Sequence, residues 1–287
     1  MVSLIVATLN RVAELERLLT SLDGQSYKDF EVIIVDQNAD DRLLPVLRKH
    51  AGLTIRHRRC EPGASRARNA GLRAANGDII GFPDDDCWYP EQLLATVTDW
   101  FNSHPDLGGL FAVLRSADNQ PVGPKWPDRP CLCTRKTLWD RGITPIGFLR
   151  CEVTEAIGFF NERIGLGAPS RYQSGEDIDY FLRTFDHGFK MWHEPGITVH
   201  HPSFHAPERL RDRTYCYALG GGYVMRAHGY SWRLLLKGLA SSLGGAVVNL
   251  LRGNIFLARI YLVRGAGLLR GYVLGPRDLR KIEPAVH

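Results

Sequence analysis

The sequence predicts an α/β fold with a doubly wound, mostly parallel central sheet and a helical extension at the C-terminal end. Three observations lead to this expectation. Short apolar runs alternate with segments of helical periodicity in the first part of the chain. Aspartates follow two of these runs, where the carboxyl ends of parallel strands would meet. After residue 231 the composition changes to Leu, Gly, Ala and Val with spaced cations.

The apolar runs are short and end at polar or turn-forming residues, as expected for buried strands. They are Val2–Ala7, Glu31–Asp36, Leu53–Arg59, Asp78–Phe82 and Gly109–Leu114, and Lys190–His201 carries a further short strand. Leu53–Arg59 is the most polar of them, which favours a place at the edge of the sheet.

Helical spacing of leucines follows the first strand, and Thr8 or Asn10 could cap the helix that it predicts. Its apolar positions are Leu15, Leu18, Leu19 and Leu22, and further helices are expected at Leu43–His50, Ala64–Asn76, Pro90–Ser103 and Glu176–Phe185. Between residues 116 and 175 prolines and glycines interrupt the periodicity, which is typical of binding loops.

The composition is that of an ordinary globular protein, with 287 residues, 44% hydrophobic and 23% charged. The net charge of +5 is mild and the arginines are spread along the chain. This favours anionic ligands or a membrane surface as partners, and nucleic acid is not expected. The six cysteines form no C-x-x-C pair and no secretory signal is evident, so reduced thiols and a cytoplasmic location are expected.

Three consecutive carboxylates, Asp84, Asp85 and Asp86, stand directly behind the run Asp78–Phe82. Adjacent carboxylates repel one another, and a divalent cation resolves that repulsion. Oxygen ligands favour Mg²⁺ or Mn²⁺, which usually bring phosphate oxygens with them. Taken alone, the triplet could equally be a solvated turn before the next helix. Asp36 would lie at the same edge of the sheet, and this shared position supports a site there.

A second acidic group, Glu176, Asp177 and Asp179, follows Gly175 at the start of a predicted helix. Carboxylates there interact favourably with the positive end of a helix, which is the structural interpretation. A carboxylate in this position could instead act as a general base on an incoming hydroxyl group.

His200 and His201 end the last predicted strand. An imidazole near two acidic groups could complete a metal shell, and it would shift the preference from Mg²⁺ toward Mn²⁺. A histidine pair at the end of a strand can also be purely structural.

The C-terminal segment combines apolar residues with cations at Arg233, Lys237, Arg252, Arg259, Arg264 and Arg270. Its longest stretch without a charge, Gly238–Leu251, is shorter than the ~20 residues that a transmembrane helix needs. Two apolar helices with basic edges are expected, either packed on the rest of the protein or lying on an anionic membrane surface.

Together these residues resemble the inverting glycosyltransferases of family 2, which have the GT-A fold. The resemblance extends from Val2 to Phe204 and rests on motifs in the family's order. The matching segments are Leu4–Arg11, Val32–Asp36, Gly63–Gly71 (close to G-x-S-x-A-R-N-x-G), Asp84–Asp86 (the D-x-D element), Glu176-Asp177 and His201-Pro202.

The resemblance implies two domains. Residues 1–230 would form the GT-A domain, with a nucleotide-sugar-binding half at 1–115 and an acceptor-binding half at 116–230. Residues 231–287 would form a basic helical extension that could associate with a membrane. The implied protein is a membrane-associated enzyme of surface-polysaccharide biosynthesis, on the cytosolic face of the cell membrane.

The resemblance also implies a role for each site residue. The donor, a nucleoside-diphosphate sugar and most often a UDP-sugar, would contact Ala7, Thr8, Asn10, Arg11, Asp36, Ser65, Arg68, Asp84 and Asp85. Asp84 would lie near the ribose, and for Asp85 the alternative to a donor contact is that it faces away. Asp86 and His201 would hold Mn²⁺ or Mg²⁺. Asp177 would be the base on the acceptor hydroxyl, with Glu176 positioning the acceptor or the base.

One departure from the family's pattern bears on the donor. The usual acidic run after the second strand is replaced by Asp36-Gln37-Asn38, so that a thymidine or guanosine sugar remains an alternative to a uridine sugar. Two other functions also fit the fold class. A sugar nucleotidyltransferase should have a glycine-rich basic loop after the first strand, where this chain has Ala7-Thr8-Leu9-Asn10. A non-catalytic binding module would need no base.

Overall fold

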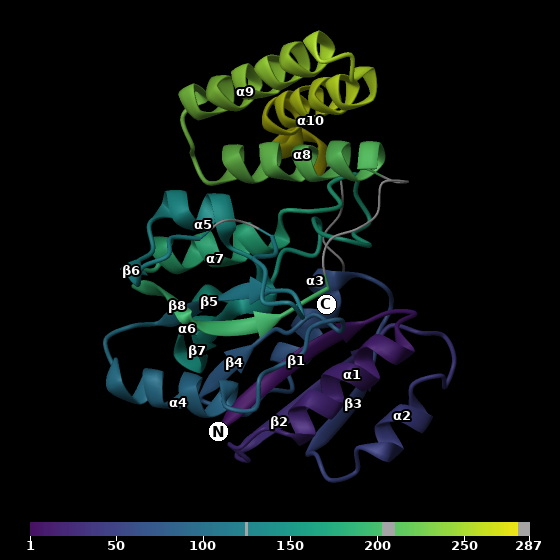
Figure 1. Cartoon of the computed structure of the whole chain (residues 1–287), viewed down its shortest axis with the longest axis vertical. Coiled ribbons are helices and arrows are strands. Elements are labelled where there is room, and N and C mark those ends of the chain that lie inside the picture. Colours follow the sequence, from purple (N-terminus) through teal and green to yellow (C-terminus); the bar gives the residue numbers. More distant parts are fainter. Residues whose placement is uncertain (124–125, 203–209, 281–287) are drawn as a thin grey trace. The chain divides into compact units, whose positions relative to one another are not determined.

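The computed structural model describes residues 1–123, 126–202 and 210–280. It divides into two compact units, of which the first contains residues 1–160 and 180–204 and the second residues 161–179 and 205–287. Residues 281–287 of the predicted extension, and the last two residues of the segment that resembles the family, lie outside the described residues. Each unit is described by itself below (Figure 1).

The first unit is built on one mixed sheet of eight strands, in the order β3-β2-β1-β4-β7-β5-β8-β6. The strands are β1 (Val2–Thr8), β2 (Phe30–Asp36), β3 (Ile55–Arg59), β4 (Ile79–Gly81), β5 (Gly109–Arg115), β6 (Cys131–Leu132), β7 (Gly147–Arg150) and β8 (Met191–His200). β7 is antiparallel to both of its neighbours, and β6 is antiparallel to β8. The other six strands therefore share one direction, so their carboxyl ends lie at the same edge.

Helices connect these strands, as the alternation of patterns predicts. They are α1 (Val12–Asp23), α2 (Leu44–Lys49), α3 (Ala64–Leu72), α4 (Leu93–Ser103), α5 (Arg135–Arg141), α6 (Cys151–Ile157) and α7 (Glu176–Asp186), with a 3₁₀ turn at Thr144–Ile146. The apolar stripe predicted for α1 is buried as expected. The predicted α/β fold with a doubly wound sheet is confirmed, and so is the place of β3 at the sheet edge.

The core explains why the central strands are continuous apolar runs. Every residue of β2 is buried, as is nearly every residue of β1, because parallel strands are covered on both faces. This packing requires glycine at position 71 of α3, because a Cβ on Gly71 would lie only 2.2 Å from Cγ2 of Ile5. The helix can approach β1 this closely only with a residue that lacks a side chain.

Two local expectations were wrong, and one strand was not expected. Neither Thr8 nor Asn10 caps α1: the N-cap position is Arg11, and no side chain caps the helix there. α3 ends at Leu72, four residues before the predicted Asn76. β7 was not expected, because a four-residue strand within an irregular segment shows no readable period.

The second unit contains three long helices, α8 (Leu210–Ala227), α9 (Trp232–Leu251) and α10 (Ile255–Arg280). α8 and α10 run parallel and approach closely, since a Cβ on Gly271 would lie 2.0 Å from the carbonyl oxygen of Leu219. α9 packs antiparallel on α10 through Gly245, where a Cβ would lie 2.4 Å from the ring of Tyr261. Because α8 packs with α10, the two compact units divide the chain at other positions than the predicted boundary at residue 230.

Candidate active site

The acidic triplet lies in a turn after β4, and backbone contacts fix that turn to the end of β8. The amide of Cys87 donates to the carbonyl of Asp84 at 3.0 Å, which closes the turn. Trp88 and His200 then exchange two backbone hydrogen bonds of 3.0 Å, and their rings stack with centroids 5.4 Å apart. This bridge brings the residue after His200 next to the triplet.

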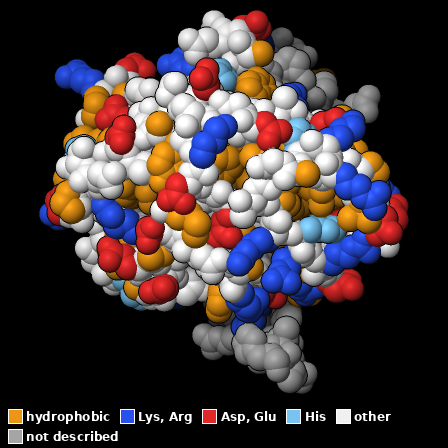
Figure 2. Space-filling model, turned by 90° about the horizontal axis from the view of Figure 1, so that it is seen from below, with side chains coloured by type: hydrophobic (Ala, Val, Ile, Leu, Met, Phe, Trp, Pro, Cys, Tyr) orange, Lys and Arg blue, Asp and Glu red, His pale blue; other side chains and the backbone are white. Residues whose placement is uncertain are grey.

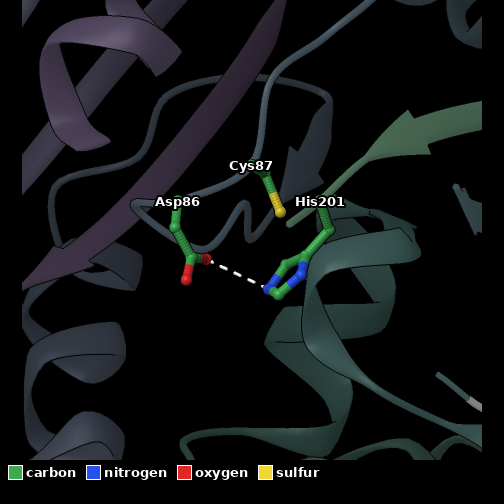
Figure 3. A group of neighbouring side chains, drawn as sticks. All are labelled: Asp86, Cys87 and His201. Atoms are coloured by element: carbon green, nitrogen blue, oxygen red, sulfur yellow. Dashed lines mark ion pairs between the residues drawn. The ribbon is translucent and has the colours of Figure 1, made fainter. Parts of the chain in front are cut away.

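Asp86 and His201 are consequently in direct contact. Nε2 of His201 lies 3.1 Å from Oδ1 of Asp86, and both side chains are largely buried. Figure 3 shows the two side chains pointing toward each other, with the Cys87 thiol beside them. Ligand atoms of these three residues lie within 4.8 Å of one another. The ring of His200 has a different neighbour, since its Nδ1 lies 3.2 Å from the carbonyl oxygen of Ser116.

Two arginines of the first helix and its preceding loop hold the other side of the turn. Arg11 bridges Asp85, at 3.1 Å, and the second carboxylate oxygen of Asp86. Arg17 donates to the backbone carbonyl of Asp86 at 2.7 Å and lies over the ring of Trp88. Asp85 is buried and faces Arg11.

Burial and these charges set the protonation of the cluster. Burial raises the pKa of Asp85 to about 6, against the opposing effect of Arg11. Burial alone would also raise the pKa of Asp86, but the hydrogen bond and charge of His201, together with Arg11, lower it to about 2. Burial lowers the pKa of His201, and the contact with Asp86 outweighs this and raises it above its ordinary value.

The donor set fits a divalent cation. In an octahedral shell with ligands at about 2.1 Å, neighbouring ligand atoms lie roughly 3 Å apart, and Asp86 and His201 are 3.1 Å apart. A carboxylate with an imidazole suits Mn²⁺ better than Mg²⁺. Cys87 adds little, because burial and the neighbouring carboxylates raise the pKa of its thiol well above the ordinary value.

Arg68 of α3 points to the remaining carboxylate of the triplet. Its guanidinium is buried, donates to the Thr144 hydroxyl at 2.9 Å and lies 3.6 Å from Oδ1 of Asp84. Asp84 is the most exposed of the three aspartates, with 38% of its side chain accessible. Ser65 lies in the same helix and is buried. Arg68 is thus a buried cation beside the triplet, which distinguishes it from a surface salt bridge.

Other residues of the Gly63–Gly71 motif have structural tasks. Gly63 has φ 148°, a backbone conformation that favours glycine, and its amide donates to the side chain of Gln37 at 2.7 Å. The side chain of Asn69 both donates to and accepts from the backbone of Phe160, at 3.0 and 2.7 Å. The motif therefore fixes two loops to α3.

Asp36 lies at the end of β2, and its carboxylate is enclosed by polar partners. Oδ1 accepts from the backbone and side-chain nitrogens of Asn38, at 2.8 and 2.7 Å, and Oδ2 lies 3.0 Å from Nε2 of His57. The sequence did not point to His57, although β3 was expected at the edge. The register of β3 on β2 explains the contact, because His57 pairs with Ile34, two residues before Asp36.

The remaining predicted donor contacts lie at the end of β1 and just beyond it. Ala7 and Thr8 are the last residues of that strand, and Thr8 is paired in register with Asp36. Asn10 has the positive φ of 60°, its amide donates to Asn38 at 2.8 Å, and its side chain accepts from Arg42 at 2.7 Å. The structure thus gathers the predicted donor and metal residues at the carboxyl ends of β1, β2, β4 and β8.

Glu176 and Asp177 belong to the second unit, where they begin α7. The loop before them is fixed to α8: the Ser174 hydroxyl lies 3.2 Å from the carbonyl of Cys216, and a Cβ on Gly220 would lie 2.1 Å from the Ser174 carbonyl. Asp179 contacts His228 at 3.0 Å, and both side chains are largely buried. Asp179 is therefore a structural partner of α8, while Glu176 and Asp177 stay candidates for catalysis.

The charges outside the site are mixed. On the face seen in Figure 2, acidic and basic side chains are interspersed and form no continuous field of one sign. This agrees with the expectation from the mild net charge, and it concerns that face only.

The sequence is similar to known proteins over more than half of its length. The model of the family "Glycosyl transferase family 2" matches residues 3–149. An uncharacterized glycosyltransferase of Haemophilus influenzae is 40% identical over 209 residues, which cover 69% of this chain and 64% of that protein. The chain thus spans less than two thirds of the length of that relative.

Solved structures share the fold at low sequence identity. TarS of S. aureus, in complex with UDP, superposes with a TM-score of 0.61 at 16% identity, covering 98% of this chain and 91% of that one. The mannosyltransferase PcManGT of Pyrobaculum calidifontis, in complex with GDP-Man and Mn²⁺, has a TM-score of 0.61 at 18% identity, covering 93% and 86%. These likenesses confirm the predicted GT-A architecture.

Proposed function

Since the chain belongs to glycosyl transferase family 2 and is a transferase, we propose that it moves a sugar from a nucleoside-diphosphate sugar to a hydroxyl of a saccharide or a lipid-linked saccharide. The product would be a surface polysaccharide. The observation that carries the proposal is the contact between Asp86 and His201 beside Arg11, at the edge of the sheet where strands β1, β2, β4 and β8 end. Parallel sheets bind their ligands at this edge.

The proposal includes dependence on a divalent metal. Asp86 and His201 would hold Mn²⁺ or Mg²⁺, and the bound ion would neutralise charge on the leaving diphosphate. The fit of a carboxylate and an imidazole at 3.1 Å supports this, and a similar fold was solved with Mn²⁺ and GDP-Man.

The donor would lie along the ends of β1, β2 and β4. Asp36 would reach the nucleotide base together with His57 and Asn38, and Asp84 would lie near the ribose. Arg68 and Arg11 are cations beside the triplet, suited to the diphosphate oxygens. UDP and GDP-Man are the nucleotides bound by the similar solved structures, and a UDP-sugar is the donor proposed here.

Transfer would be one displacement with inversion. The acceptor oxygen forms a bond to the anomeric carbon as the bond from that carbon to the diphosphate oxygen breaks. The electron pair of the broken bond leaves with the nucleoside diphosphate. The proton of the acceptor hydroxyl goes to Asp177, and Glu176 positions the acceptor or the base. Both residues lie at the start of α7, directly after a loop that is fixed to α8. Such a position suits groups that must be held in place.

Two other functions are less well supported. A sugar nucleotidyltransferase should have a glycine-rich loop with Arg and Lys after β1, and the chain has Ala7-Thr8-Leu9-Asn10 there. A binding module would not need Asp177 in addition to the Asp86 and His201 pair. The proposed location is the cytosolic face of the cell membrane, because a lipid-linked acceptor is held there.

The test is a thermal-shift screen of nucleoside diphosphates with and without Mn²⁺. A transfer assay follows, with nucleoside-diphosphate sugars of the nucleotide that stabilises the protein. We expect a nucleotide to raise the melting temperature only when Mn²⁺ is present. Asp86→Ala should abolish that effect, while Asp99→Ala, an exposed aspartate on α4, should keep it. Equal stabilisation with and without metal would rule out the metal assignment.

A further inference from the structure

The helix α9 carries most of its large apolar residues on its exposed surface. Its buried residues are Leu235, Ser242 and Ala246, and Ser242 lies against Gly265 of α10. Large apolar side chains stand on the exposed part of the helix, and most of them are three, four or seven residues apart. They are Trp232, Leu236, Leu243, Val247, Leu250 and Leu251, of which Leu243 is 60% exposed. This is the reverse of the pattern of a helix on the surface of a water-soluble domain.

α10 has three sides, and two of them are covered. Glycines 267, 271 and 275 lie against α8, while Tyr261 and Leu268 lie against the glycines of α9. The third side presents Ile255, Leu262, Leu269 and Val273, which are all about half exposed. The outward sides of α9 and α10, called here the hairpin face, hold most of the exposed large hydrophobic side chains of the described residues.

From Trp232 to Gly275 the charge of this hairpin has one sign. Between Trp232 and Gly275 the sequence contains no Asp or Glu, and its six cations are all exposed. They are Arg233, Lys237, Arg252, Arg259, Arg264 and Arg270. An apolar surface with exposed cations and no anion complements a surface that combines hydrocarbon with negative headgroups.

Other occupants fit less well. α9 is by length and composition able to cross a membrane, with a mean hydropathy of 1.6 and only 17% of its window buried. Its partner α10, however, carries Arg259, Arg264 and Arg270 along its length, which opposes insertion of the pair across a bilayer. A second copy of the chain would place cations against cations in a twofold interface, and no acidic residue between Trp232 and Gly275 could pair them.

We propose that the hairpin face docks in the plane of an anionic phospholipid bilayer, with its apolar side chains among the upper acyl chains and its cations at the lipid phosphates. This inference rests on the proposed function for its purpose, because a lipid-linked acceptor would be presented at that surface. α8 packs on α10 and also holds the loop before Asp177, so the docked bundle would carry this candidate base.

The experiment is sedimentation of the full chain with sucrose-loaded vesicles of phosphatidylcholine, alone or mixed with phosphatidylglycerol. We expect partition into the mixed vesicles that is at least an order of magnitude stronger and falls with added salt. A double variant of the apolar side, Leu243→Ser with Val247→Ser, and one of the cations, Arg233→Gln with Lys237→Gln, should each lose most of it. Leu132→Ser, which changes an exposed leucine of β6, should bind like the unaltered protein.

Several results would overturn the proposal. One is binding that ignores phosphatidylglycerol or survives both double variants. Another is a dimer by light scattering that the apolar variant dissociates while vesicles are not bound, since a second copy would then cover the face. Resistance of the membrane-bound protein to alkaline carbonate extraction would indicate a spanning helix. The nucleotide-dependent thermal shift, measured on the same variants, should persist, so failure of docking is distinguishable from failure of the proposed function.

Discussion

Asp86 and His201 come from turns after two different strands, yet their side chains meet at 3.1 Å. The contact follows from the backbone bridge between Trp88 and His200, which joins the turn after β4 to the end of β8. The sequence places Asp86 and His201 at strand ends. The bridge between Trp88 and His200 explains why His201, rather than His200, reaches the carboxylate of Asp86.

The first prediction distinguishes those two histidines. His201→Ala should weaken Mn²⁺-dependent binding of a nucleoside diphosphate by about tenfold or more, because it removes one of the two proposed protein ligands. His200→Ala is the matched control, since its bridge to Trp88 uses backbone atoms that the substitution retains. Isothermal titration calorimetry with and without Mn²⁺ measures both. A larger loss for His200→Ala than for His201→Ala would contradict the assignment.

The second prediction concerns Arg11, whose removal should strengthen the binding of Mn²⁺ alone. Its guanidinium contacts Asp85 and Asp86, so it would compete with the proposed cation for the carboxylate of Asp86. Arg11→Ala should therefore bind Mn²⁺ alone severalfold more tightly, while it binds nucleoside diphosphate with Mn²⁺ more weakly. Arg58→Ala, an exposed arginine of β3, is the control. Unchanged affinity for the metal alone would show that Arg11 does not compete.

Most of the fold could be predicted because buried parallel strands have a strong signal. The fully apolar runs of β1 and β2 and the leucine stripe of α1 leave few alternatives. α8 was not expected, because the run Gly220-Gly221-Gly222 disfavours a helix. In the structure these glycines allow close contact, since a Cβ on Gly222 would lie 2.2 Å from the Leu268 carbonyl. Tertiary packing thus overrides the local propensity.

The residues of the site also fall into two groups, those that the sequence could place and those that it could not. Residues at strand ends, such as Asp36 and Asp84, could be placed by the sheet alone. Their partners could not, because His57 reaches Asp36 through strand register and Arg17 reaches the triplet from the second turn of α1. These contacts depend on side-chain direction in three dimensions. No spacing in the sequence encodes them.

A third prediction concerns the two acidic residues at the start of α7. Asp177→Asn should lower kcat by about 10²–10⁴-fold and leave nucleotide affinity nearly unchanged, as expected on loss of a general base. Asp179→Asn should behave differently, because Asp179 is a partner of His228. It should cost about 1–3 kcal/mol of unfolding free energy and retain far more turnover. Turnover assays and thermal melting measure the two effects. Unchanged kcat in Asp177→Asn would remove this residue from the role of base.

The last prediction tests the packing that carries the loop before Asp177. Gly271 lies where α10 meets α8, and a Cβ there would lie 2.0 Å from a backbone oxygen that cannot move aside cheaply. Gly271→Ala should therefore destabilise the helical unit by roughly 1–3 kcal/mol or more, because the two helices must separate.

Gly244 provides the matched substitution, since it lies in α9 and a Cβ there would meet no atom within 4 Å. Gly244→Ala should stabilise the protein by about 0.5–1 kcal/mol, because alanine restricts the unfolded chain and favours the helix. Urea unfolding followed by circular dichroism, with limited proteolysis of α8–α10, measures both variants. If the two substitutions had the same sign, the difference between the packed and the open glycine would not control stability. Opposite signs would show that close contact between α8 and α10 holds the bundle, and with it the loop that Ser174 ties to α8.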